Sequence, residues 1–128
     1  MQPLTAEWVD KAEGDLTVAS REIRARKAPN YDAACFHAQQ CAEKYLKAVL
    51  QEEGIAFPKT HYLERLLNLV LPFEPGWNVL RVDLIQLSTS AIEVRYPGNS
   101  AIRNEARESV RVCKEVRARV RHRLSLPV

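Results

Sequence analysis

The stretch ACFHAQQCAEKYLKA, residues 34–48, carries the pattern that decides the fold. Its apolar residues recur at steps of three and four, the spacing that places side chains on one face of an α-helix. They are Ala34, Ala38, Cys41, Tyr45 and Ala48. The helix is expected to begin at Asn30 or Asp32, either of which can cap it, and to run to Glu53. Gly54 then suits the first position beyond the helix, because glycine enters the left-handed region without a Cβ penalty.

Segments on both sides of this stretch show the same helical period. The pattern predicts further helices at about residues 5–25, 61–71, 78–95 and 100–124. Thr5, Thr60 and Ser100 are the expected N-caps, since a hydroxyl can accept a hydrogen bond from an amide of the first turn. The helix over 78–95 is expected to bury Val79 and Leu84. No window shows the strict alternation of a strand, so the sequence predicts an all-α fold: an up-and-down antiparallel helical bundle of four long helices plus one short helix.

The bulk composition is that of an ordinary globular protein. The chain has 128 residues, 46% of them hydrophobic and 27% charged, which suits one helical domain spanning residues 1–128. No stretch reaches the roughly 20 apolar residues that cross a bilayer, and no signal peptide is evident, so no membrane partner is expected. An odd number of cysteines (Cys35, Cys41 and Cys113) argues against a disulfide scaffold and indicates a reducing compartment, the cytoplasm.

Positive charge is concentrated at the C-terminal end of the chain. The formal net charge is +3, yet residues 100–124 alone hold eight Lys or Arg against three Glu, a local net of +5. Arg103, Arg107 and Arg111 repeat every four residues and form a basic ridge on the predicted last helix. Such a ridge can follow a phosphate backbone, dock an acidic protein, or simply be a solvated helix face.

Polar residues form a second stripe on the helix over residues 34–48. His37, Gln40 and Lys44 lie at steps of three and four, so they project from one side of that helix. This stripe can bind a phosphate or move a proton; the alternative is a solvated face with an incidental histidine.

The stretch RYPG at residues 95–98 similarly permits two interpretations. It either ends a helix, or places Arg95 and Tyr96 at the mouth of a groove, where Arg can hold phosphate and Tyr can stack on a base.

Four blocks of sequence, taken together, resemble the prokaryotic HEPN domain family. The blocks are Trp8 with Ala12 and Asp15-Leu16, HAQQCAEKYLKA at residues 37–48, KTHYL at residues 59–63, and RYPG at residues 95–98. The resemblance implies an up-and-down helical bundle that is commonly a homodimer. It also implies a small nucleotidyltransferase partner, encoded alongside, with the pair acting as a toxin–antitoxin module. Many members of the family are metal-independent ribonucleases.

The chain departs from the nuclease members of that family at one motif. Those members carry an Arg, a polar residue next to it, and a His four to six residues beyond the Arg. Arg103-Asn104 begins this pattern, but no His follows at the right distance. Arg117 and His122 have the spacing, although Ala118 replaces the polar residue, and they are the catalytic candidates that this motif offers. A standard ribonuclease mechanism is therefore not expected.

The first functional hypothesis is a HEPN-like component of a two-gene module that binds nucleotide or RNA in a polar groove. The expected lining residues are His37, Lys44, Arg95 and Tyr96, with Gln40, His61 and Arg103 in secondary positions. The first alternative is a metal-independent endoribonuclease toxin, using Arg117 with His122 or His37 with Arg95. The second is a non-catalytic protein-interaction module. The histidines and cysteines do not complete a ligand set, so no metal or other cofactor is expected.

Overall fold

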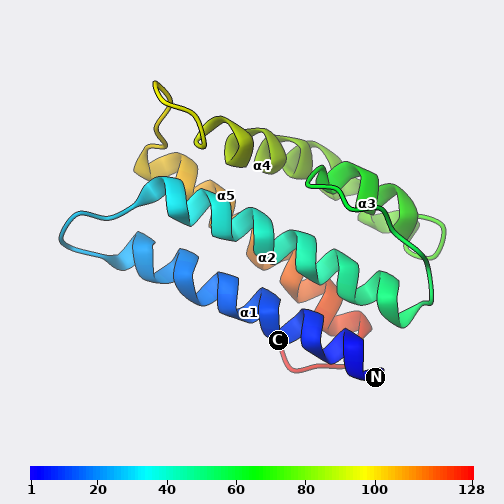
Figure 1. Cartoon of the computed structure of the whole chain (residues 1–128). Coiled ribbons are helices and arrows are strands. Elements are labelled where there is room, and N and C mark those ends of the chain that lie inside the picture. Colours follow the sequence, from blue (N-terminus) through cyan, green and yellow to red (C-terminus); the bar gives the residue numbers. More distant parts are fainter.

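A computed structural model describes all 128 residues and contains helices but no strand (Figure 1). The elements are α1 (Pro3–Arg24), α2 (Tyr31–Glu52), α3 (Leu63–Val70), a 3₁₀ helix η1 (Pro75–Leu80), α4 (Arg81–Glu93) and α5 (Arg103–Arg123). The all-α prediction of four long helices and one short one is confirmed. No helix of the chain is both long enough and apolar enough to span a membrane.

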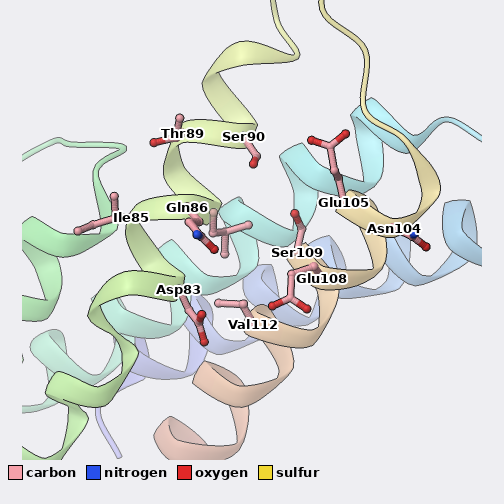
Figure 2. Close-up of a pocket in the computed structure, with 11 residues that line it drawn as sticks. Asp83, Ile85, Gln86, Thr89, Ser90, Asn104, Glu105, Glu108, Ser109 and Val112 are labelled. Atoms are coloured by element: carbon pink, nitrogen blue, oxygen red, sulfur yellow. The ribbon is translucent and has the colours of Figure 1, made fainter.

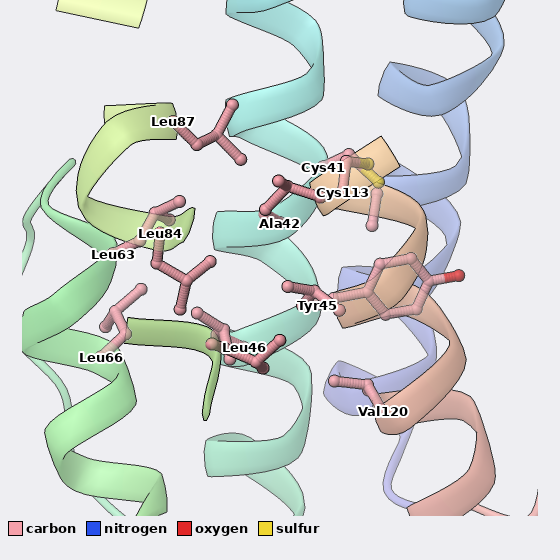
Figure 3. Close-up of a cluster of buried hydrophobic side chains, with 14 of the residues drawn as sticks. Cys41, Ala42, Tyr45, Leu46, Leu63, Leu66, Leu84, Leu87, Cys113 and Val120 are labelled. Carbon is pink, nitrogen blue, oxygen red and sulfur yellow. The ribbon is translucent and has the colours of Figure 1, made fainter. Parts of the chain in front are cut away.

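Helix α2 lies at the centre of the bundle and packs against α1, α3, α4 and α5. All five residues of the predicted apolar stripe are buried, but the opposite side of α2 is buried as well. Ala42 and Leu46 on that second side face Leu63 and Leu84, whereas Tyr45 faces α1 and α5 (Figure 3). Because α2 is enclosed on both sides, its polar residues Gln39, Glu43 and Lys47 are buried, and each is hydrogen-bonded within the molecule.

The three hydroxyl caps predicted from the sequence are wrong. Helix α1 begins earlier, at Pro3, because proline is favourable in the first turn, and the Thr5 hydroxyl instead donates to a Glu52 carboxylate oxygen at 2.9 Å. Thr60 accepts the Tyr62 amide in the loop before α3, at 3.1 Å. Helix α5 begins only at Arg103, with the expected Ser100 outside it.

Two of the predicted helix ends are confirmed at the residues proposed for them. The Asn30 side chain accepts the Ala33 amide at 2.9 Å and caps α2. Asp32, the alternative cap, accepts the Ala101 amide at 2.7 Å and thereby ties the α4–α5 connection to the start of α2. Gly54 follows α2 with a φ of +69°, as expected for its position.

The segment before α4 differs from the prediction of one continuous helix over residues 78–95. Residues 75–80 form η1, in which residues three apart lie on the same side, so Trp77 and Leu80 are both buried. Val79, which the sequence analysis placed in the core, is 70% exposed because it lies between these two. Val82 and Ile85 continue this exposed apolar stripe along α4.

Candidate functional site

His37 and Lys44, from the polar stripe of α2, meet at a single carboxylate of α1. The His37 Nδ1 atom lies 2.8 Å from Asp15 Oδ1, and Lys44 Nζ donates to Asp15 Oδ2 at 2.6 Å. Asp15 is buried, while both partners are partly exposed. The contact between Nδ1 and Asp15 fixes the orientation of the ring and leaves Nε2 as the ring nitrogen not engaged by Asp15.

Arg95 reaches the same side of the bundle from the end of α4. Its guanidinium carbon lies 5.2 Å from the centre of the Phe36 ring, and that ring packs edge-on against His37 with centroids 5.2 Å apart. Phe36, His37 and Arg95 line a hollow of about 310 Å³, here named the His37–Arg95 cleft. Arg95 has no carboxylate within ion-pair distance, so its N–H groups remain available to a ligand.

The other predicted groove residues lie outside this cleft. Lys44 is connected to it only through Asp15, and Tyr96, at 62% exposed, extends from the connection after α4 without lining the hollow. Gln40 donates to the Gln39 side chain at 2.8 Å. The structure therefore brings together two of the four expected binding residues, His37 and Arg95.

His61 belongs to a second polar cluster farther along α2. Its Nδ1 atom lies 3.1 Å from Glu43 Oε1, and Lys47 Nζ donates to Glu43 Oε2 at 3.0 Å. Gln39 donates to the His61 carbonyl at 2.9 Å. Glu43 and Lys47 are buried, so this cluster fixes the loop before α3 to α2 and leaves only the His61 ring exposed.

Arg117 and His122 lie on different sides of α5 and do not share a cleft. Arg117 makes a bidentate ion pair with Glu13 of α1, through Nε to Oε2 at 3.0 Å and Nη2 to Oε1 at 2.8 Å. This pairing lowers the pKa of Glu13 below its ordinary value. His122 instead lines a hollow with Trp77, on the side of η1. Their spacing in the sequence thus produces a structural ion pair and an isolated exposed histidine.

A groove of about 430 Å³ between α4 and α5 was not expected from the sequence (Figure 2). Carboxylates of Asp83, Glu105 and Glu108 line it, around an apolar floor that includes Leu87 and Val112. We name it the acidic groove. No lysine or arginine lines this groove, so it offers no cation to a phosphate, whereas its apolar floor continues into the exposed stripe of α4.

The thiols of the chain do not form a metal site. Cys35, Cys41 and Cys113 are free and buried, and no group of three or more His, Cys, Asp or Glu side chains is arranged to hold a metal ion. The hydrogen bond with the Cys113 thiol and burial both raise the pKa of Cys41, and burial raises that of Cys35. These cysteines are therefore unreactive core residues.

Asp15 and Phe36 were not among the predicted site residues, although Asp15 belongs to one of the blocks that resemble the HEPN family. Asp15 had a detectable signal, because it is an acid placed directly beside Leu16 on the apolar face of α1. Phe36 had none, since an aromatic residue on an amphipathic helix is usually a core residue. Its ring instead lies half-buried between His37 and Arg95.

Comparison with known proteins agrees with this architecture. A family model described as "HEPN domain" matches residues 5–123. A protein of Methanocaldococcus jannaschii named "Putative toxin MJ1304" is 32% identical over 97 residues, which is 70% of this chain; the chain spans only 61% of that relative.

Two crystal structures share the fold. TT1696 from Thermus thermophilus has a TM-score of 0.79 and 23% identity, with 94% of this chain and 98% of that chain covered. ST0689, described as an archaeal HEPN homologue, has a TM-score of 0.74 and 24% identity, with 96% and 98% covered.

Proposed function

The chain belongs to the HEPN domain family, and from this premise we propose that it binds nucleotide or RNA through phosphate in the His37–Arg95 cleft. The observation that carries the proposal is that Arg95, without an ion pair, and His37, held by Asp15, line one hollow. A guanidinium offers two parallel N–H donors to phosphate oxygens, and the Phe36 ring beneath it limits its movement.

Binding measurements on two ligands test this proposal. AMP and a labelled RNA oligomer are titrated into the wild-type protein and into Arg95→Gln. The loss of a charge-assisted contact is expected to weaken both ligands about tenfold or more. Arg65→Gln, an exposed arginine on α3 without an ion pair, is the matched control and should bind as the wild type does. Equal affinity of Arg95→Gln and the control would reject the cleft as the binding site.

A second candidate function is metal-independent RNA cleavage, favoured by the Asp15–His37 pair beside Arg95. The RNA 2′-hydroxyl would attack the adjacent phosphorus, its proton passing to His37 Nε2, while the P–O5′ bond breaks and the leaving oxygen takes a proton from water. Arg95 would stabilise the charge on the phosphorane-like transition state. RNA incubated with the protein in EDTA should be cleaved, and His37→Asn should abolish cleavage; intact RNA with the wild type would reject this candidate.

We propose further that the chain acts in the cytoplasm as part of a two-gene toxin–antitoxin module with a small nucleotidyltransferase as partner; the toxin-named relative supports the toxin part of this proposal. Co-expression tests this role. Expression of the chain alone should arrest growth, and co-expression with the product of the neighbouring gene should relieve that arrest. The two proteins should also co-purify. A neighbouring gene of another class, together with no effect on growth, would argue against the module.

The exposed apolar stripe beside the acidic groove fits a protein contact, and we propose that a second copy of the chain packs on it. Val79, Val82 and Ile85 are exposed along this face. Burial of such a stripe is favourable in a homodimer. Sedimentation equilibrium should show a dimer for the wild type and a monomer for Ile85→Glu; a wild-type monomer, or an unchanged dimer in the variant, would reject this surface.

A further inference from the structure

Four arginines from distant parts of the sequence line one hollow at the end of the bundle where α1 ends and α5 begins. Arg24 and Arg26 come from the end of α1 and the connection after it, and Arg103 and Arg107 come from the first two turns of α5. The hollow has a volume of about 530 Å³ and also includes Tyr31. We name it the arginine pocket.

The arginine pocket contains no carboxylate and no neutralising contact. All four arginines are exposed, and none of them makes an ion pair or a side-chain hydrogen bond. Two glutamates close in sequence to these arginines accept backbone amides instead: Glu22 accepts the Asn30 amide at 2.9 Å, and Glu105 accepts the Ile102 amide at 3.1 Å. Like charges held together without counter-charges are unfavourable in the free protein, so an anionic ligand gains from binding there.

Hollows that share lining residues lead from this pocket to the His37–Arg95 cleft, and together they form a path. A third hollow of about 370 Å³ shares Pro29 and Tyr31 with the arginine pocket and shares Asn30 and Asp32 with the cleft. Figure 1 shows the α1–α2 and α4–α5 connections together at this end of the bundle. Tyr31 and His37 are six residues apart on α2, or about 9 Å along the helix axis. That separation is too long for one phosphate and corresponds to roughly three nucleotides of a stacked strand.

We propose that the arginine pocket is a second phosphate-binding site, so that a single RNA strand runs from it across Tyr31 into the His37–Arg95 cleft. The inference rests on the proposed function of that cleft. The pocket holds the phosphodiester backbone without reading bases, and Tyr31, which is half-buried and lines both the arginine pocket and the hollow next to it, offers a ring on which a base can stack. The ligand class is therefore single-stranded RNA rather than a mononucleotide.

The test compares a double arginine variant with a charge-matched control. Arg103→Gln with Arg107→Gln removes two charges from the pocket. Lys11→Gln with Arg65→Gln removes two exposed, unpaired charges elsewhere, Lys11 lying about 20 Å from Arg24 along α1. Each protein is titrated with AMP and with an oligouridine of about twelve nucleotides, within the usual range of single-strand sites. The salt dependence of the affinity is measured, and thermal unfolding verifies the fold.

The double arginine variant is expected to bind the oligomer about tenfold or more weakly and to bind AMP as the wild type does. Its plot of log affinity against log salt should be shallower by about 1.4, the value for two lost phosphate contacts to a single strand. Oligomer binding equal to that of the control would overturn the second site, even if Arg95→Gln still loses AMP. If the wild-type protein binds neither ligand, the proposed function fails as well.

Asp32→Asn provides an independent variant that should strengthen binding. Asp32 is the only acid that lines the path, and asparagine keeps an oxygen to accept the Ala101 amide. Removing its charge should tighten oligomer binding several-fold and leave the melting temperature near that of the wild type. Unchanged oligomer affinity would contradict a strand that crosses this position.

Discussion

The start of α5 and the rest of that helix are both rich in arginine, but the arginines differ in their pairing. From Arg111 to the end of the helix every arginine contacts a carboxylate: Arg111, Arg117, Arg119, Arg121 and Arg123. At the start of the helix Arg103 and Arg107 contact none, and they face two more unpaired arginines of α1 and the connection after it. The arginines of α5 are therefore of two kinds: some form structural ion pairs, and others keep a positive charge that no carboxylate contacts. Only the second kind can act on a ligand.

The largest expected difference between these two parts of α5 is in stability. Arg117→Ala leaves the Glu13 carboxylate, partly buried against α1, without its bidentate partner, which is expected to lower the free energy of unfolding by about 1–3 kcal/mol. Arg107→Ala on the same helix loses no partner and should change it by less than about 0.5 kcal/mol. Urea unfolding of both variants measures the contrast. Equal losses would show that the pairing of Arg117 with Glu13 has no energetic consequence.

The pH dependence of stability sharpens the same contrast. Arg117 lowers the pKa of Glu13 from its ordinary 4.5, so in this range the unfolded chain binds the proton more readily. The stabilising contribution is therefore complete above about pH 4.5 and is lost as pH falls through the lowered folded pKa. The stability difference between the wild type and Glu13→Gln should shrink as pH is lowered below 4.5.

Glu7→Gln, at an exposed glutamate of α1 without an ion pair, is the control for that titration. A difference between the wild type and Glu13→Gln that stays constant down to about pH 3 would contradict the pairing.

The smallest effect is expected at Arg111, where the pairs are exposed. Its guanidinium contacts Asp83 and Glu115, each at 3.2 Å, and Glu108 at 2.6 Å, but half of the side chain is accessible to water. Arg111→Gln should change the free energy of unfolding by about 0.5 kcal/mol or less, and added salt should remove the difference. A loss of stability as large as that of Arg117→Ala would mean that the exposed pairs of Arg111 stabilise the fold as much as the partly buried pair of Arg117 does.

Local sequence patterns predicted the helices and the burial of one face of α2, because helical periodicity depends only on neighbouring residues. The same patterns did not predict η1, since Pro75 starts a tighter turn that exposes Val79 and buries Trp77 and Leu80. Hydroxyl caps were wrong because Pro3 could begin α1 earlier and the Glu105 side chain could satisfy the start of α5.

The site was predicted only in part, for a reason that depends on the tertiary fold. His37 and Arg95 were expected in one groove, and the structure places them together. Asp15 was not expected there, because its contact with His37 and Lys44 depends on how α1 and α2 are aligned. The arginine pocket joins residues almost 80 positions apart, and no local pattern relates Arg24 to Arg103.

The central claim, that phosphate binds in the His37–Arg95 cleft, can be tested on the histidine rings themselves. The chain has three histidines, His37 in the cleft, His61 beside Glu43 and His122 beside Trp77, so their ring signals in an NMR spectrum are few enough to assign. Titration with AMP should shift the His37 signals saturably and leave those of His122 in place. His37 signals that do not move, or equal shifts of all three rings, would contradict binding at this cleft.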